Sequence, residues 1–332
     1  LERIYKRCLQ IMLKKIFDNL DVPDGEKEDL YVTEKIFKKD HKIGKNFKNQ
    51  PSLLFKTKKS GAINNNYLGK NIYLRFNIPC KITEGKNILD ENYTILSCIS
   101  EDKEIKKIFL EVCGTTFSNI SNEPSNNEIR DVTESIIDLF KNLPDAKKGY
   151  IGLWGELFLI ASSSNQLKVL EAWHNHAEDK YDFYDDNEAL EVKCTTNGDR
   201  KHQFRHHQLV SKIEGHYVTS ILTKPKSSKG LSVLDLYKKI LKNKMDINLK
   251  DKVNKIYYKI VGNTPEEKLN EFKYDFDFAK KNLLYFKVSE ISTLKNKDQS
   301  ITDIEYKMDL SQKQNVDSLS KDKFTSYLHF PN

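Results

Sequence analysis

The most constraining feature of this 332-residue chain is an apolar segment that contains a single charge. Glu156 is the only charged side chain in 149–167, and the residues around it, GLWGELFLI, are apolar on nearly every face of a helix. A buried carboxylate is costly unless it meets a cation, a metal ion or strong donors. Gly152 and Gly155 lie one turn apart and would let another element approach. The segment predicts a buried helix over 146–162 with a functional glutamate, and a structural ion pair is the alternative.

The second feature is the segment YDFYDDNEALEVKCTT, residues 181–196, which predicts a β-hairpin. Alternation with period two divides the second strand into an apolar face of Leu190, Val192 and Cys194 and a polar face of Glu191, Lys193 and Thr195. An antiparallel pairing about the turn places Asp182, on the first strand, beside Glu191. The hairpin therefore predicts two opposed carboxylates with a lysine on the same face.

Two opposed carboxylates repel each other unless a cation lies between them, and their oxygens are the ligands that Mg²⁺ prefers at about 2.1 Å. Lys193 could then hold or deprotonate a water molecule aimed at a phosphorus atom. An exposed cross-strand salt bridge explains the hairpin alone equally well. The lone Glu156, arriving shortly before the hairpin, favours the metal site.

At this point the sequence resembles the PD-(D/E)XK nuclease superfamily, whose core runs helix, three strands, helix, strand. The corresponding segments here are 146–162, 181–186, 189–195, 201–205, 207–213 and 216–223. More narrowly, GLWGELFLI, Ala172–Trp173, Asp182–Phe183, EVKCTT and Gln208–Leu209 are similar to a bacterial group of this superfamily found near restriction and phage-defence genes. The part of the chain that bears these motifs covers about a quarter of it.

The resemblance implies an α+β fold with a restriction-endonuclease-like αβββαβ core. It also implies that Asp182, Glu191 and the main-chain carbonyl of Val192 bind Mg²⁺, with Mn²⁺ as a substitute. Lys193 would serve the water molecule. The remaining implied site residues are Glu156, which supports the site from the helix, and Gln208, which contacts it. In one departure from the family pattern, Tyr181 stands where a proline often precedes the aspartate.

The rest of the chain shows organisation but no assignable motif. Short β-rich runs at 30–35, 53–57, 71–76 and 93–98 precede a polar stretch at 118–127. The predicted domains are a β-containing region over 1–120, the nuclease core over 125–225 and a mainly helical region over 226–332. In the last region, helices are expected around 231–244, 250–261 and 265–272, followed by a strand at 284–289.

Three further patterns carry less weight. His174, Asn175 and His176 spell HNH, but the nuclease of that name spreads its residues over a ββα unit, so this interpretation is rejected. Six of the eight histidines lie between His174 and His216, and most are expected in exposed loops. The segment 222–244 holds seven lysines and could follow a phosphate backbone, although a solvated helix face explains it nearly as well.

Charge, cysteine content and hydropathy indicate which partners and which compartment the chain is suited to. The net charge of +7 permits an anionic partner without requiring one. Five widely spaced cysteines without a CxxC pair indicate a reducing cytoplasm. No stretch approaches the roughly 18–20 apolar residues that cross a bilayer, and residues 1–20 read as an amphipathic helix rather than a secretion signal.

The sequence thus predicts a metal-dependent endonuclease that hydrolyses DNA, in a bacterial restriction or phage-defence system. A non-catalytic or partner-dependent subunit that uses the fold as a nucleic-acid-binding or assembly scaffold is the alternative. RNA as the substrate is a third possibility. A homodimer, or a complex with a motor or methyltransferase partner, is also compatible with the sequence.

Overall fold

The chain forms two compact units, and the second interrupts the first in sequence. The computed structural model describes residues 13–25, 27, 29–36, 40–58, 66–117, 120–141, 150–175, 179–186, 188–210, 213–291 and 304–313. Unit 1 comprises 1–146 with 246–263, and unit 2 comprises 147–245 with 264–332. This division does not follow the predicted boundaries near 120 and 225. Of the helix expected over 1–20, only 13–20 lies within the described residues, and 13–19 is helical.

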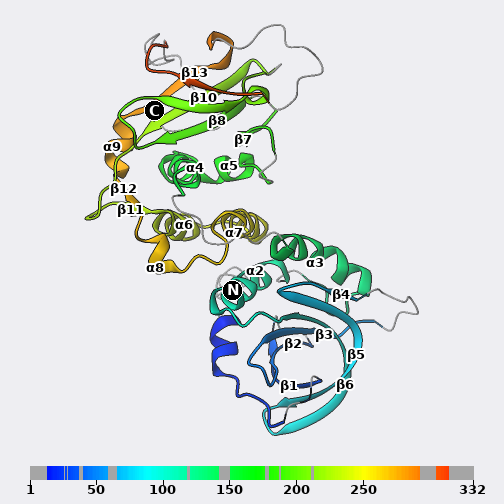
Figure 1. Ribbon diagram of the computed structural model, residues 1–332. Coiled ribbons are helices and arrows are strands. Elements are labelled where there is room, and N and C mark those ends of the chain that lie inside the picture. Colours follow the sequence, from blue (N-terminus) through cyan, green and yellow to red (C-terminus); the bar gives the residue numbers. More distant parts are fainter. Residues whose placement is uncertain are drawn as a thin grey trace. The chain divides into compact units, whose positions relative to one another are not determined.

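Unit 1 is built around a six-stranded sheet in the order β1-β2-β3-β6-β5-β4. Its strands are β1 (Leu30–Ile36), β2 (His41–Lys45), β3 (Pro51–Phe55), β4 (Tyr67–Leu68), β5 (Ile72–Glu84) and β6 (Asn87–Cys98). These strands overlap the four β-rich runs expected in this region. A further, parallel pairing of β1 with β5 closes five of the strands into the ring that Figure 1 shows. Closure pairs both edges of each of these strands.

Three helices of unit 1 pack against one another: α2 (Lys103–Thr116), α3 (Asn126–Lys141) and α7 (Ile247–Val261). The last was expected in a separate C-terminal region, but its side chains bond to α2. Asp251 accepts hydrogen bonds from the hydroxyls of Thr115 at 3.0 Å and Thr116 at 2.7 Å. The Tyr258 hydroxyl donates to Glu111. These contacts explain why α7 belongs to unit 1.

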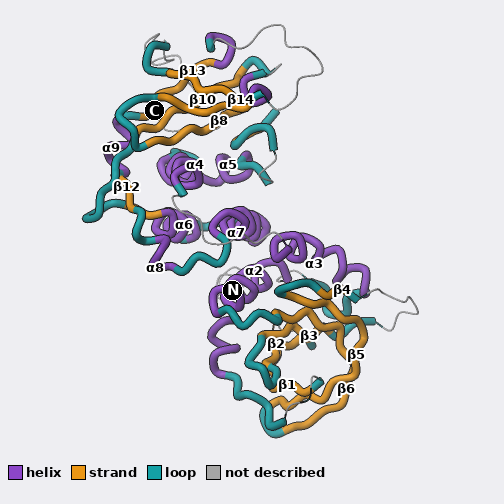
Figure 2. The backbone as a smooth tube through the Cα atoms, viewed as in Figure 1, coloured by secondary structure: helices purple, strands orange, loops and turns teal. Residues whose placement is uncertain are grey.

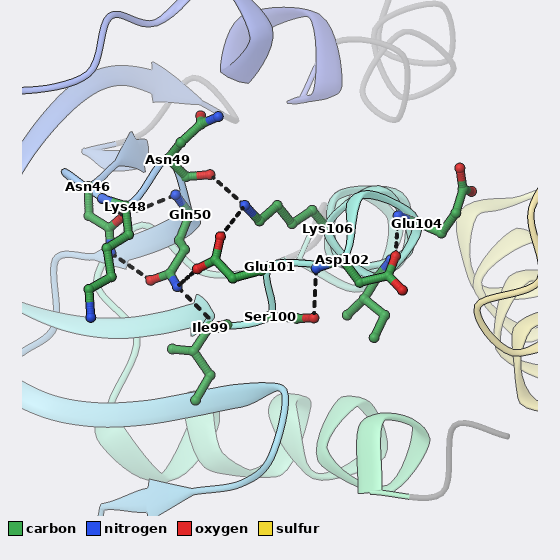
Figure 3. A network of polar contacts seen from close by, with 11 residues as sticks. Asn46, Lys48, Asn49, Gln50, Ile99, Ser100, Glu101, Asp102, Glu104 and Lys106 are labelled. Atoms are coloured by element: carbon green, nitrogen blue, oxygen red, sulfur yellow. Dashed lines mark hydrogen bonds and ion pairs between the residues drawn. The ribbon is translucent and has the colours of Figure 1, made fainter. Parts of the chain in front are cut away.

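A polar network joins the β2–β3 turn to the start of α2, as Figure 3 shows. Asn46 donates to the Gln50 side chain at 2.9 Å, and Gln50 in turn donates to Glu101 at 3.0 Å. Lys106 approaches Glu101 at 3.5 Å, and Asp102 caps the helix by accepting from two backbone amides. The network therefore fixes α2 against the strands.

Unit 2 contains the predicted hairpin within a four-stranded sheet of order β13-β10-β8-β7. The strands are β7 (Phe183–Tyr184), β8 (Glu188–Thr195), β10 (Gly215–Leu222) and β13 (Leu283–Lys287). The β8–β10 pair is parallel and the two outer pairs are antiparallel. The remaining elements up to the hairpin are α4 (Ile151–Ser162) and α5 (Gln166–Ala172). Figure 2 shows both helices beside the sheet.

Helix α4 packs closely on β8, as its glycine pattern suggested. A Cβ atom added to Gly155 would lie 2.8 Å from Cβ of Cys194 and 3.3 Å from Cγ1 of Val192. The apolar face predicted for this strand therefore meets the helix. Gly152 plays no such part, because a Cβ atom there would have nothing within 4 Å. The expectation was right for one glycine and wrong for the other.

The mixed α+β class is confirmed, but the expected arrangement of the core differs in two places. Strand β9 (Lys201–Arg205) forms as predicted, yet it pairs with β14 (Glu305–Asp309) in a separate two-stranded sheet. The helix expected at 207–213 is a single 3-10 turn, η2 (His206–Leu209), within the described residues. The elements follow the expected order along the chain except that a 3-10 turn stands in place of the second helix, and the specific core stays a prediction.

The C-terminal part of unit 2 is more mixed than the expected mainly helical region. Its elements are β11 (Leu231–Ser232), α6 (Val233–Leu241), α8 (Glu266–Leu269), β12 (Lys273–Tyr274), α9 (Phe276–Lys281), β13, η3 (Val288–Glu290) and β14. The strand expected at 284–289 is β13, which forms one edge of the sheet. Among the described residues, no helix is long and apolar enough to cross a membrane.

The two glycines of α4 provide a matched stability test. Gly155→Ala should lower the free energy of unfolding by about 1–3 kcal/mol, because the added methyl group overpacks the contact with Cys194. Gly152→Ala should be neutral or raise it by up to about 1 kcal/mol, because alanine favours the helix and the position is open. Urea unfolding of both variants measures the difference, and equal effects would contradict the close approach of α4 to β8.

Candidate active site

The site is organised by the pairing of β7 with β8. Phe183 lies opposite Leu190 and Tyr184 opposite Ala189, which is the register predicted from the sequence. Continued by one residue, this register sets Asp182 beside Glu191. The Val192 amide also donates to Oδ2 of Asp182 at 2.6 Å. A main-chain bond from the second strand therefore holds the aspartate in place.

Burial and mutual repulsion act on the two carboxyls. Removal from water raises the pKa of Asp182 well above its usual range, and the nearby charges of Glu191 and Glu156 raise it further. Burial likewise raises the pKa of Glu191, although the Lys193 ammonium partly offsets the shift. Glu191 is only 2% exposed. The pair is therefore poorly satisfied as two ionised groups unless a cation neutralises them.

Lys193 and Gln208 converge on one oxygen of Glu191. The Lys193 ammonium lies 2.8 Å from Oε1 of Glu191, and the Gln208 amide donates to the same oxygen. Lys193 also donates to Oε1 of Gln208 at 3.4 Å, and the Arg205 amide donates to that oxygen at 2.9 Å. The other oxygen, Oε2 of Glu191, is buried and has no hydrogen-bond partner in the described part of the chain.

Glu156 meets its predicted partners in two aromatic side chains. The Trp173 indole donates to Oε2 of Glu156 at 2.7 Å, and Nε2 of His174 lies 3.1 Å from the same oxygen. The resemblance included Trp173 only as part of a motif, and His174 was set aside with the rejected HNH tripeptide. A buried glutamate requires nearby hydrogen-bond donors, and this requirement is the sequence signal that points to such partners.

One ligand atom from each of Glu156, His174 and Asp182 lies within 4.8 Å of the others. With the unpartnered oxygen of Glu191, the site offers three carboxylates and an imidazole in a partly or fully buried setting. Carboxylate oxygen and imidazole nitrogen are ordinary ligands of divalent cations. The residues present therefore fit a divalent metal ion.

Two other histidines of this region are buried, whereas His207 is exposed as expected. His202 and His216 are buried rather than in exposed loops, and burial lowers the pKa of each to about 4. His202 bonds to the Ser220 hydroxyl at 2.7 Å, whereas the His216 ring packs on Tyr181. Strand positions facing the core account for this burial. His176 lies outside the described residues.

Part of the lysine-rich segment 222–244 is neutralised. Lys226 lies 3.1 Å from Asp275, and Lys238 lies 2.7 Å from Glu266. These ion pairs favour the solvated-face explanation for those two lysines.

The fold and the site together define an α+β protein with a cluster of acidic residues and one lysine on a strand pair beneath a helix. The family described as "Putative PD-(D/E)XK family member (DUF4420)" matches residues 13–311, and the chain belongs to this family. The resemblance drawn from the sequence is thereby confirmed. No curated protein and no solved structure was found to match the chain.

The raised pKa of Asp182 predicts that its charge destabilises the metal-free protein. A carboxyl whose folded pKa is raised contributes stability at low pH, which is lost as the pH rises from its unfolded pKa through its folded pKa. Asp182→Asn removes the charge and keeps an oxygen for the Val192 amide. In EDTA, its Tm should exceed that of the wild type at neutral pH, by about 2–4 °C for each 1 kcal/mol gained.

The difference in Tm should shrink as the pH is lowered toward 4, because the wild-type carboxyl then also becomes neutral. Thermal unfolding of both proteins between pH 4 and 8 measures it. A variant that is less stable than the wild type at pH 8, or a difference independent of pH, would contradict the buried position of this charge.

Proposed function

We propose that the protein is a metal-dependent endonuclease that hydrolyses the phosphodiester bonds of DNA in a bacterial restriction or phage-defence system. The observation that carries this proposal is the convergence of Asp182, Glu191, Lys193 and Gln208 on the β7–β8 pair, with one carboxylate oxygen buried and unpartnered among the described residues. Membership of a family described as PD-(D/E)XK-like supports the same chemistry.

Asp182, Glu191 and the Val192 carbonyl would hold Mg²⁺ or Mn²⁺. When bound, such an ion stabilises the negative charge that develops on the phosphate during hydrolysis. The Val192 amide contributes by fixing Asp182, and Gln208 contributes by fixing Glu191. These two hydrogen bonds leave Oε2 of Glu191 available for the ion.

Lys193 is suited to position the attacking water. Its ammonium is anchored between Glu191 and Gln208, and its side chain is 18% exposed, so water reaches it. A lysine donor can orient a water molecule, and a lysine held near charged groups can also take part in proton transfer. The water oxygen would lose a proton and bond to phosphorus as the bond between phosphorus and the 3′ oxygen breaks. The 3′ oxygen would take up a proton from solvent, which leaves a 3′-hydroxyl and the 5′-phosphate that the family resemblance implies.

The setting and partners form a second part of the proposal. DNA is the proposed substrate, and a homodimer or a motor or methyltransferase partner would supply selectivity. We also propose a cytoplasmic location. The described cysteines, Cys80, Cys98, Cys113 and Cys194, are all free thiols, which is compatible with a reducing compartment.

Lys193→Met tests the proposed role of the lysine. It should reduce kcat for DNA cleavage by about 10²–10⁴-fold, because it removes the group that positions the water, and it should leave metal binding in place. Lys35→Met is the matched control, since Lys35 forms an exposed ion pair with Asp40 in unit 1. Single-turnover cleavage of DNA and RNA substrates with Mg²⁺ or Mn²⁺ measures both variants.

Equal cleavage by Lys193→Met and the wild type would overturn the role given to Lys193. A scaffold subunit would give two results together. The wild type would cut neither substrate, and calorimetry would show no metal-binding heat that differs between the wild type and Glu191→Ala. Preferential cleavage of RNA would correct the substrate class alone.

A further inference from the structure

His174 is held beside the carboxylate cluster by its main chain. It follows the end of α5, where Trp173 forms an isolated β-bridge with Phe183. The His174 amide donates to the carbonyl oxygen of Asp182 at 2.9 Å. The backbone that carries the imidazole is therefore fixed to the backbone that carries the aspartate.

The imidazole lies beside the acidic side chains and is largely shielded from solvent. The His174 side chain is 8% exposed and that of Glu156 is 12% exposed, with 3.1 Å between Nε2 and Oε2. Asp182 completes the group whose ligand atoms lie within 4.8 Å of one another. Two donor atoms on opposite sides of one ion lie at most about 4.4 Å apart when each bond is about 2.2 Å. Ligand atoms within 4.8 Å of one another can therefore reach one ion after a small shift of the side chains.

The charge balance of the site calls for a cation there. Glu156, Asp182 and Glu191 carry three negative charges when ionised, and Lys193 supplies one positive charge. Lys193 bonds to Oε1 of Glu191, so Oε2 of that side chain stays buried without a partner among the described residues. This orphaned oxygen is evidence, independent of the Glu156–His174–Asp182 group, that the cluster accommodates a further positive charge.

We propose that His174, together with Glu156 and Asp182, ligates a divalent transition-metal ion, and that this nitrogen ligand makes the site favour Mn²⁺ over Mg²⁺. Imidazole suits transition metals, whereas Mg²⁺ prefers oxygen ligands in octahedral geometry. The inference deepens the proposed function, since it rests on the same cation site at Asp182. It adds a nitrogen ligand to the expected set and changes the ion that the set prefers.

Pulsed electron paramagnetic resonance of the Mn²⁺-loaded full chain tests the ligand directly. A bound imidazole gives a modulation from ¹⁴N that oxygen ligands do not give. The modulation should be present in the wild type and absent from His174→Gln, in which the amide can still donate to Glu156. His207→Gln, which changes an exposed histidine of the same unit, should retain it.

Calorimetry with each metal alone tests the preference. The wild type should bind Mn²⁺ more tightly than Mg²⁺, and His174→Gln should weaken Mn²⁺ binding by at least about 10-fold while changing Mg²⁺ binding much less. Should the variant fold poorly, wild-type protein labelled with ¹⁵N-histidine replaces it. The ¹⁴N modulation should then give way to that of ¹⁵N.

A Mn²⁺-loaded wild type without nitrogen modulation, or a modulation unchanged by both His174→Gln and the ¹⁵N-histidine label, overturns the inference. The outcome is separable from that of the proposed function. If the imidazole binds Mn²⁺ but the protein cuts no nucleic acid, the inference holds and the proposed nuclease function is wrong. If the protein cuts nucleic acid with Mg²⁺ but no nitrogen binds the metal, the proposed function holds and the inference is wrong.

Discussion

The close contact between α4 and β8 is the constraint on which the rest of the site depends. Because Gly155 has no side chain, the helix approaches the face of the strand that carries Val192 and Cys194. Glu156, the next residue, then lies close enough for its charge to act on both Asp182 and Glu191. A bulkier residue at position 155 would separate the helix from the strand and remove one of the three acidic groups from the cluster.

The packing of α4 on β8 matters for chemistry because it brings three acidic side chains together. Each acidic side chain has donors: Asp182 a main-chain amide, Glu156 an indole and an imidazole, and Glu191 the side chains of Lys193 and Gln208. Among the described residues, Oε2 of Glu191 nevertheless stays buried without a hydrogen-bond partner. Bringing three carboxylates into a water-poor space raises the free energy of the metal-free fold. A bound cation would offset this cost in free energy. When no cation is bound, protonation of one carboxyl partly offsets it.

The features that could be predicted from the sequence are those set by local periodicity. Strict alternation fixed the two faces of β8, and the short turn fixed the pairing that sets Asp182 beside Glu191. The apolar surroundings of Glu156 indicated that it needed partners. Gln208 was expected at the site from the family resemblance, and it bonds to Glu191.

The features that could not be predicted depend on residues distant in the chain. Strand β9 pairs with β14, about a hundred residues later, so no local pattern could show that it leaves the main sheet. Helix α7 is amphipathic like its neighbours in sequence, and only its contacts with α2 assign it to unit 1. His174 reaches the site because α5 returns the chain to the hairpin, a tertiary effect that its tripeptide context concealed.

The most direct measurement of the central claim is anomalous diffraction at the manganese edge from crystals of the protein soaked in Mn²⁺. We expect an anomalous peak bounded by the side chains of Asp182 and Glu191, on the β7–β8 pair. An occupied ion elsewhere with no peak at these carboxylates, or a crystal structure with Asp182 and Glu191 on opposite sides of the sheet, would contradict it.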